Sequence, residues 1–162
     1  MSTLQRLADR GTIKPPRWLP GNVQYETIMG SVAYGVSSDT SDVDVYGWAI
    51  PMKEDIFPHL RGEIPGFGHQ AKRFEQYQEH HVEDRDALAG HGRTYDLTIF
   101  GIVKFFALAM ENNPNIIDSL FTPATCVLHC YEGRQPRAGE PSPVPAQGGV
   151  AEVQGLCVLA AS

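Results

Sequence analysis

Two short apolar segments, and the polar motifs at their ends, most constrain how this chain can fold. In the first, residues 23–29, a period of two over residues 23–27 is followed by Ile28 and Met29, and this pattern predicts a β-strand that ends at Gly30. The second, residues 43–50, is rich in Val, Tyr, Trp and Ile and stops at Pro51, as expected of another strand. Residues 36–41 between them are small and polar, which predicts a loop.

The motifs beside these two strands suit a bound nucleotide and its metal ion. Gly30 and Ser31 follow the first strand, where a glycine lets the backbone approach phosphate oxygens and direct amide groups at them. Asp42 and Asp44 are two residues apart, so on a strand both carboxylates point to the same face. Mg²⁺ commonly binds one or two protein carboxylates. Each motif alone is common in turns and loops, but the two in this order favour a site for a triphosphate and Mg²⁺.

A third carboxylate often completes such a site by acting on the attacking hydroxyl, and Asp96 is the candidate. It begins an apolar stretch and is well separated from the acidic residues before it. The alternative role for Asp96 is to cap a helix that starts at Leu97. Glu54 and Asp55 lie in an expected loop and are weaker candidates.

The rest of the chain predicts an α/β (α+β) fold, in which a small mixed sheet is flanked by helices. Residues 73–82 alternate in part and predict an edge strand. Because His80 and His81 are adjacent, they should point to opposite faces of that strand and not share a metal ion. Residues 95–110 predict the clearest helix of the chain, with an apolar stripe at spacings of four, three and four made by Ile99, Val103, Phe106 and Met110. Asn113, followed by a proline, should cap a second helix.

The motif Gly30-Ser31-x-Ala-Tyr-Gly, followed by Ser-Asp42-x-Asp44-Val-Tyr-Gly, resembles the signature of predicted nucleotidyltransferases of the DNA polymerase beta superfamily. It is most similar to the subgroup associated with RNA repair. The resemblance covers roughly residues 23–129. It implies a polymerase beta-like nucleotidyltransferase core.

The same resemblance implies a role for each candidate residue. Gly30 and Ser31 would contact the triphosphate of an NTP, and Asp42 and Asp44 would bind Mg²⁺. Asp96 would be the third carboxylate and a further metal ligand. The implied reaction transfers a nucleoside monophosphate from the NTP to a hydroxyl acceptor, with RNA or tRNA as candidate acceptors. Two alternatives remain: an inactive, truncated protein that binds a nucleotide or a protein partner, and a toxin–antitoxin nucleotidyltransferase that modifies a protein or tRNA.

Composition divides the chain into a lead-in (residues 1–22), a core domain (residues 23–130) and a tail (residues 131–162). The tail is rich in Pro, Gly and Ala without any periodicity, which predicts disorder. Its codons, read one nucleotide further on, permit a basic and aromatic string similar to the one that such nucleotidyltransferases carry after this point. We therefore expect a frameshift or truncation near residue 130; the alternative is a genuine disordered tail.

The overall charge and hydropathy limit the cellular setting. A net charge of −6 argues against duplex binding driven by phosphate contacts alone. The N-terminus has no apolar signal core, and no apolar stretch reaches the roughly 20 residues needed to span a membrane. A cytoplasmic protein is expected.

Overall fold

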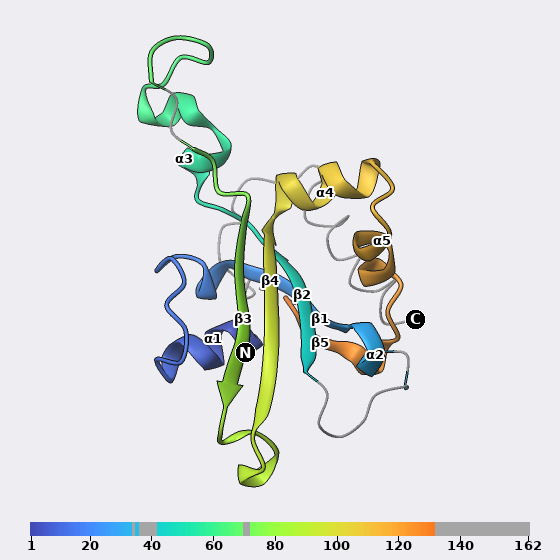
Figure 1. Ribbon diagram of the computed structural model, residues 1–162. Coiled ribbons are helices and arrows are strands. Elements are labelled where there is room, and N and C mark those ends of the chain that lie inside the picture. The colour runs from blue at the N-terminus through green and yellow to red at the C-terminus, as the bar shows by residue number, and fades with distance from the viewer. Residues whose placement is uncertain (34, 36–41, 70–71, 132–162) are drawn as a thin grey trace, which may run out of the picture.

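The structure is a computed structural model that describes residues 1–33, 35, 42–69 and 72–131. At its centre is a five-stranded sheet with the strand order β3-β4-β2-β1-β5 (Figure 1). β2 pairs in parallel with β4, and the other three pairings are antiparallel. The predicted mixed sheet with flanking helices is thus confirmed. The strands are β1 (Val23–Met29), β2 (Val43–Ala49), β3 (Gln76–Asp84), β4 (Arg93–Gly101) and β5 (Val127–Cys130).

Helices lie on both faces of the sheet (Figure 1). α1 covers one face, α4 and α5 cover the other, and a projecting arm between β2 and β3 carries α3. None of the helices among the described residues is long and apolar enough to cross a membrane. The α-helices are α1 (Thr3–Asp9), α2 (Gly30–Ala33), α3 (Lys53–Ile56), α4 (Ile102–Met110) and α5 (Pro114–Leu120); the 3₁₀ turns are Pro20–Asn22, Pro58–Arg61, Ala87–Gly90 and Ala124–Cys126.

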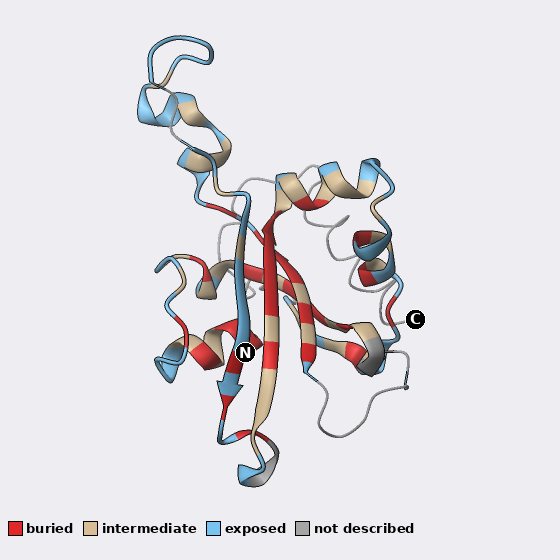
Figure 2. Cartoon of the chain, viewed as in Figure 1, coloured by how far each residue is buried: buried red, intermediate tan, exposed pale blue. Residues whose placement is uncertain are grey.

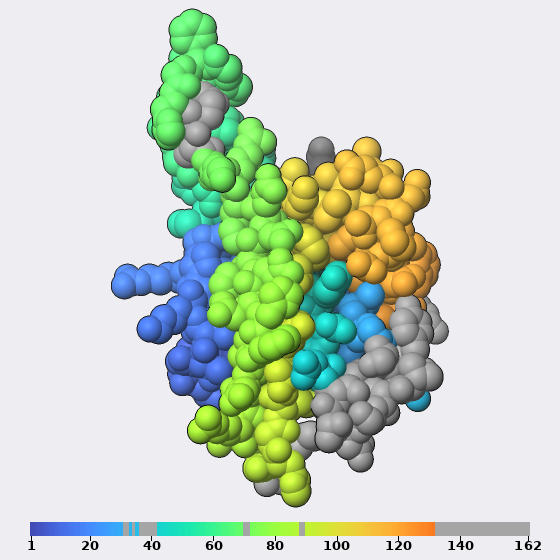
Figure 3. Space-filling view, in the orientation of Figure 1, coloured from blue at the N-terminus to red at the C-terminus, as the bar shows by residue number. Residues whose placement is uncertain are grey.

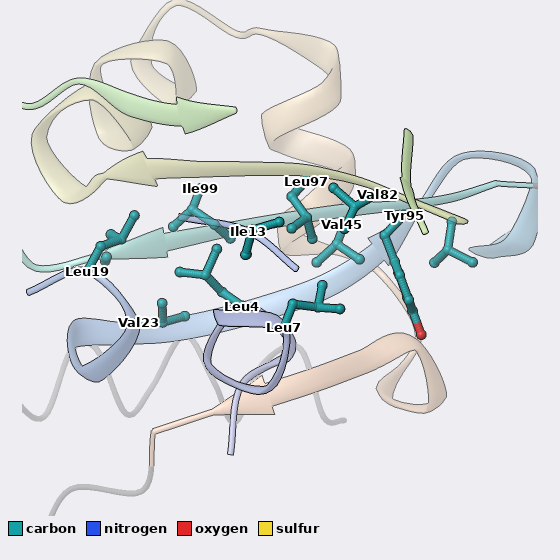
Figure 4. Packing of buried hydrophobic residues seen from close by; sticks show 12 residues of the cluster. Leu4, Leu7, Ile13, Leu19, Val23, Val45, Val82, Tyr95, Leu97 and Ile99 are labelled. Atoms are coloured by element: carbon teal, nitrogen blue, oxygen red, sulfur yellow. The ribbon is translucent and has the colours of Figure 1, made fainter. Parts of the chain in front are cut away.

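The N-terminal segment belongs to the core. Leu4 and Leu7 of α1 are fully buried against β1, β2 and β4, together with Ile13 and Leu19 (Figure 4). Figure 2 shows the buried segments concentrated in the central strands and in α1. Residues 1–22 therefore do more than lead into the domain, because they supply the apolar cover for one face of the sheet.

A buried acidic side chain fastens α1 to the edge of the sheet. The carboxylate of Asp84, at the end of β3, is 3% exposed and accepts hydrogen bonds from Arg6 at 2.5 Å and from Arg10 at 2.7 Å. Both arginines remain partly exposed, so their own desolvation penalty is limited.

Replacing Asp84 with asparagine should lower the free energy of unfolding by about 1–3 kcal/mol, because one of the two acceptor oxygens and the negative charge that faces both arginines are lost. Urea unfolding measures this change. The matched control is Asp86→Asn, since the Asp86 side chain is 80% exposed and should tolerate the change with no measurable loss. Equal stability of the two variants would contradict the anchoring role of Asp84.

A second buried acid, Glu26 of β1, is hydrogen-bonded to the first turn of α1. Its carboxylate is fully buried and accepts hydrogen bonds from the backbone N–H groups of Thr3 and Leu4. Burial raises the pKa of Glu26 above its ordinary value of 4.5, and the backbone hydrogen bonds oppose that rise only in part.

This raised pKa predicts a pH dependence of stability. The folded chain binds the Glu26 proton more tightly than the unfolded chain, so the stabilising contribution is complete below pH 4.5 and is lost as the pH rises through the folded pKa. The Glu26→Gln variant has no ionisable group at this position, so it lacks this contribution to the pH dependence. The free energy of unfolding of the wild type relative to this variant should therefore fall as the pH rises above 4.5. Urea unfolding across that range tests it, with exposed Glu111→Gln as the control; a pH-independent difference would contradict the prediction.

The helix predicted for residues 95–110 is wrong in its first half. Residues 93–101 form β4, and α4 begins only at Ile102. The strand is central and buried on both faces, so its apolar residues run together and show no period of two. The predicted apolar stripe is also wrong, because Val103 is 60% exposed and Met110 83%, whereas Phe105 is fully buried.

Other expectations are confirmed. β3 is an edge strand, and the side chain of Asn113 caps α5 by accepting a hydrogen bond from the backbone N–H of Ile116. The expected loop at residues 36–41 lies outside the described residues. So do residues 132–162, for which disorder and a frameshift stay predictions.

Candidate active site

Asp44 and Asp96 lie side by side on two adjacent strands. In the parallel pairing of β2 with β4, Asp44 is in register with Asp96. Their neighbours Val45 and Leu97 pack against α1, so by alternation both carboxylates belong to the opposite face, which carries α4 and α5. Asp42 precedes β2 by one residue and is exposed. Figure 3 shows atoms of β2, in cyan, at the surface between β4 and α5.

The acidic side chains affect one another electrostatically. The pKa of Asp44 is raised by partial burial first, then by the negative charges of Asp96 and Asp42, while His80 acts weakly in the opposite direction. Such crowding of like charges disfavours ionisation of Asp44. Asp44 therefore lies within the electrostatic influence of both Asp96 and Asp42.

A β-bulge in the edge strand holds Asp96. The register of β3 against β4 shifts between Glu79 and Val82, and His81 takes a positive φ of 55°. The backbone N–H of His81 donates a hydrogen bond to Oδ1 of Asp96 at 2.7 Å, and the Nδ1 atoms of His80 and His81 each lie 3.4 Å from a carboxylate oxygen. Partial burial would raise the pKa of Asp96, but these hydrogen bonds outweigh it and the pKa is lowered.

These contacts correct two sequence interpretations. Asp96 lies within β4 and does not cap a helix. His80 and His81 do not separate to opposite faces, because the bulge brings both rings to one carboxylate. No glycine or proline marks this bulge in the sequence, so nothing in the local pattern signals it.

Gly30 packs directly against Asp44. It has a φ of +70°, and a Cβ atom at this position would lie 2.4 Å from Oδ2 of Asp44. Met29, the residue before it, pairs with Asp44 across β1 and β2. A glycine is required here both by the backbone conformation and by the carboxylate. Ser31 follows as the second residue of α2.

The glycine turn and the paired acids thus adjoin one another at one end of the sheet. The model of the RNA repair pathway DNA polymerase beta family (RlaP) matches residues 1–133. The chain belongs to this family. No curated protein and no solved structure matches it. Membership in the RNA repair pathway DNA polymerase beta family indicates a nucleotidyltransferase-like function.

Asp44 and Asp96 could supply oxygen ligands to a divalent cation. Among the described residues no three His, Cys, Asp or Glu side chains form a ready-made metal cage. Mg²⁺ does not need one, because it commonly binds one or two carboxylates together with substrate phosphates. Asp44 and Asp96 are oxygen donors in register, and a cation would relieve the repulsion that raises the pKa of Asp44.

Proposed function

We propose that this chain is a Mg²⁺-dependent nucleotidyltransferase that transfers a nucleoside monophosphate from an NTP to a hydroxyl acceptor. The new bond joins the acceptor oxygen to the α-phosphorus, and the bond between the α- and β-phosphates breaks with release of pyrophosphate. The observation that carries the proposal is the packing of Gly30 against Asp44 beside Asp96. A turn that can approach phosphate thereby adjoins carboxylates that can bind its metal ion.

Each residue has a distinct role in this proposal. Asp42 and Asp44 hold the metal ion, and the backbone at Gly30 and Ser31 binds the triphosphate. Mg²⁺ would supply charge neutralisation on the phosphates and alignment of the attacking and leaving oxygens. The lowered pKa keeps Asp96 ionised at neutral pH, which suits a metal ligand better than a proton acceptor. His80 and His81 position Asp96 through the bulge.

The acceptor we propose is the hydroxyl end of an RNA, such as a tRNA, in keeping with the RNA repair pathway named in the family description. The chain carries a net charge of −6, so general electrostatic attraction to a polyanion is weak. Recognition of the RNA must therefore depend on local contacts near the site.

Transfer of label from NTPs radioactive at the α-phosphate tests this function. The protein is incubated with each of the four NTPs, Mg²⁺ and an RNA pool, and labelled RNA is separated on a gel. We expect label in RNA with at least one NTP, and none when the metal is chelated. NTP binding without transfer to any acceptor would indicate a nucleotide-binding module instead.

A further inference from the structure

A pocket adjoins the acidic pair on the same face of the sheet. It has a volume of about 230 Å³ and lies between the sheet and the α4–α5 pair. Tyr46 and Thr98, which line it, are in register with each other, and each is two residues beyond Asp44 or Asp96 on its strand. Side chains two residues apart on a strand point to the same face, so Tyr46 and Thr98 lie next to the two carboxylates along the strands.

The lining of this pocket suits a flat, uncharged ring. Its lining includes the buried residues Phe100 and Ile116, and the half-buried Tyr46 ring packs edge-on against Phe100 with centroids 5.9 Å apart. The described residues that line it are all uncharged, and four of them carry carboxamides. A carboxamide offers both a donor and an acceptor, as the edges of nucleobases do. The carboxamide residues are Gln76, Gln78, Asn113 and Asn115.

A row of polar side chains on β3 links the pocket to the candidate site. Nε2 of Gln76 donates to Oε1 of Gln78 at 3.1 Å, and Nε2 of Gln78 lies 2.9 Å from Nε2 of His80. Nδ1 of His80 lies in turn 3.4 Å from Oδ2 of Asp96. A ring bound to the carboxamides would therefore have a defined position relative to the reacting groups.

We propose that this pocket holds a nucleobase, a step that rests on the nucleotidyltransferase function proposed above. Its volume is below the about 300–1,000 Å³ typical of pockets that enclose a whole small ligand, so it accommodates one part of a nucleotide. Apolar and aromatic lining atoms would contact the ring face, and carboxamides such as those of Gln78 and Asn115 would bind its edge, whereas Asn113 caps α5. The base belongs either to the donor NTP or to the acceptor.

Two leucine substitutions test the pocket. Gln78→Leu and Asn115→Leu remove the carboxamides at similar size, and both positions are exposed, so folding should be retained. The matched control is Gln5→Leu in α1, on the opposite face of the sheet. Calorimetry compares three probes for each protein: NTP with Mg²⁺, inorganic tripolyphosphate with Mg²⁺, and a short single-stranded RNA.

The pattern of losses identifies the source of the base. If the base belongs to the donor, NTP affinity should fall about two- to tenfold in each pocket variant, the effect of one or two hydrogen bonds, while tripolyphosphate affinity stays unchanged. If it belongs to the acceptor, only RNA affinity should fall. Unchanged affinity for both NTP and RNA in the two variants would overturn the pocket proposal.

A separate measurement keeps the two proposals distinguishable. If neither NTP nor tripolyphosphate binds the wild-type chain with Mg²⁺, the nucleotidyltransferase function is contradicted. The pocket is then tested by itself: each free ribonucleoside is added to the protein, and changes in the amide chemical shifts are recorded by NMR. Shifts confined to Tyr46, Thr98 and Asn115 and lost in Gln78→Leu support a base site, and shifts spread over the surface or absent overturn it.

Discussion

Replacing Asp44 with asparagine should reduce nucleotidyl transfer by about a hundredfold or more and remove the Mg²⁺ dependence of NTP binding. Metal-ion stabilisation of a reacting phosphate contributes several kcal/mol, and each 1.36 kcal/mol corresponds to about a tenfold change in rate. The asparagine side chain has nearly the same size as aspartate but lacks the negative charge that would hold the ion. Single-turnover transfer from labelled NTP and calorimetry with and without Mg²⁺ measure the two effects.

The same variant should not lose stability. Asp44 is partly buried beside Asp96 and Asp42, and its raised pKa shows that its negative charge is disfavoured in the folded chain. Removing that charge should leave the melting temperature unchanged or raise it when no metal is present. Asp86→Asn, on an 80% exposed side chain, is the control and should keep full activity. An active Asp44→Asn protein would contradict the assignment, and loss of activity with unfolding would point to a structural role.

Gly30→Ala should lose NTP binding almost completely and destabilise the fold. A positive φ costs about 1–2 kcal/mol for a residue with a Cβ atom, and here that atom would also lie 2.4 Å from Oδ2 of Asp44. Relief of the clash requires either the turn or the carboxylate to move. Both are needed for the proposed triphosphate and metal site, so calorimetric NTP affinity should fall below detection.

Gly11→Ala separates backbone strain from the clash. Gly11 has a φ of +74°, and a Cβ atom there would meet nothing within 4 Å. Both variants should show a similar strain penalty in urea unfolding, but Gly30→Ala should lose additional stability and Gly11→Ala should bind NTP normally. Wild-type NTP affinity in Gly30→Ala would show that the turn and Asp44 take no part in binding.

The first two strands could be predicted because their signals are local. A period of two in residues 23–29 gives a strand without reference to the rest of the chain. The strand at residues 43–49 likewise fixes the face of Asp44 by alternation, whereas Asp42 lies one residue before the strand, so its shared face with Asp44 stays a prediction. The family could be recognised for the same reason, because the two motif segments that resemble it, residues 30–35 and 41–47, are short and local.

The rest of the site depends on pairings between distant segments. The register that places Asp96 beside Asp44 joins strands about fifty residues apart, and the apolar run around Asp96 resembles a helix when its partners are unknown. The contact of Gly30 with Asp44 and the bulge at His81 likewise arise only when the sheet has formed. Such features follow from tertiary packing, which cannot be predicted from the periodicity of a single segment.

Metal binding to the carboxylates is the central claim, and paramagnetic broadening by Mn²⁺ tests it most directly. Mn²⁺ favours the same carboxylate and water ligands as Mg²⁺ and weakens amide NMR signals near the ion. With NTP present, the amides of Val43, Asp44 and Asp96 should broaden first, and Asp44→Asn should abolish the effect. Broadening centred on another acidic cluster, such as Glu54 and Asp55 in α3, or no localised broadening at all, would contradict the account.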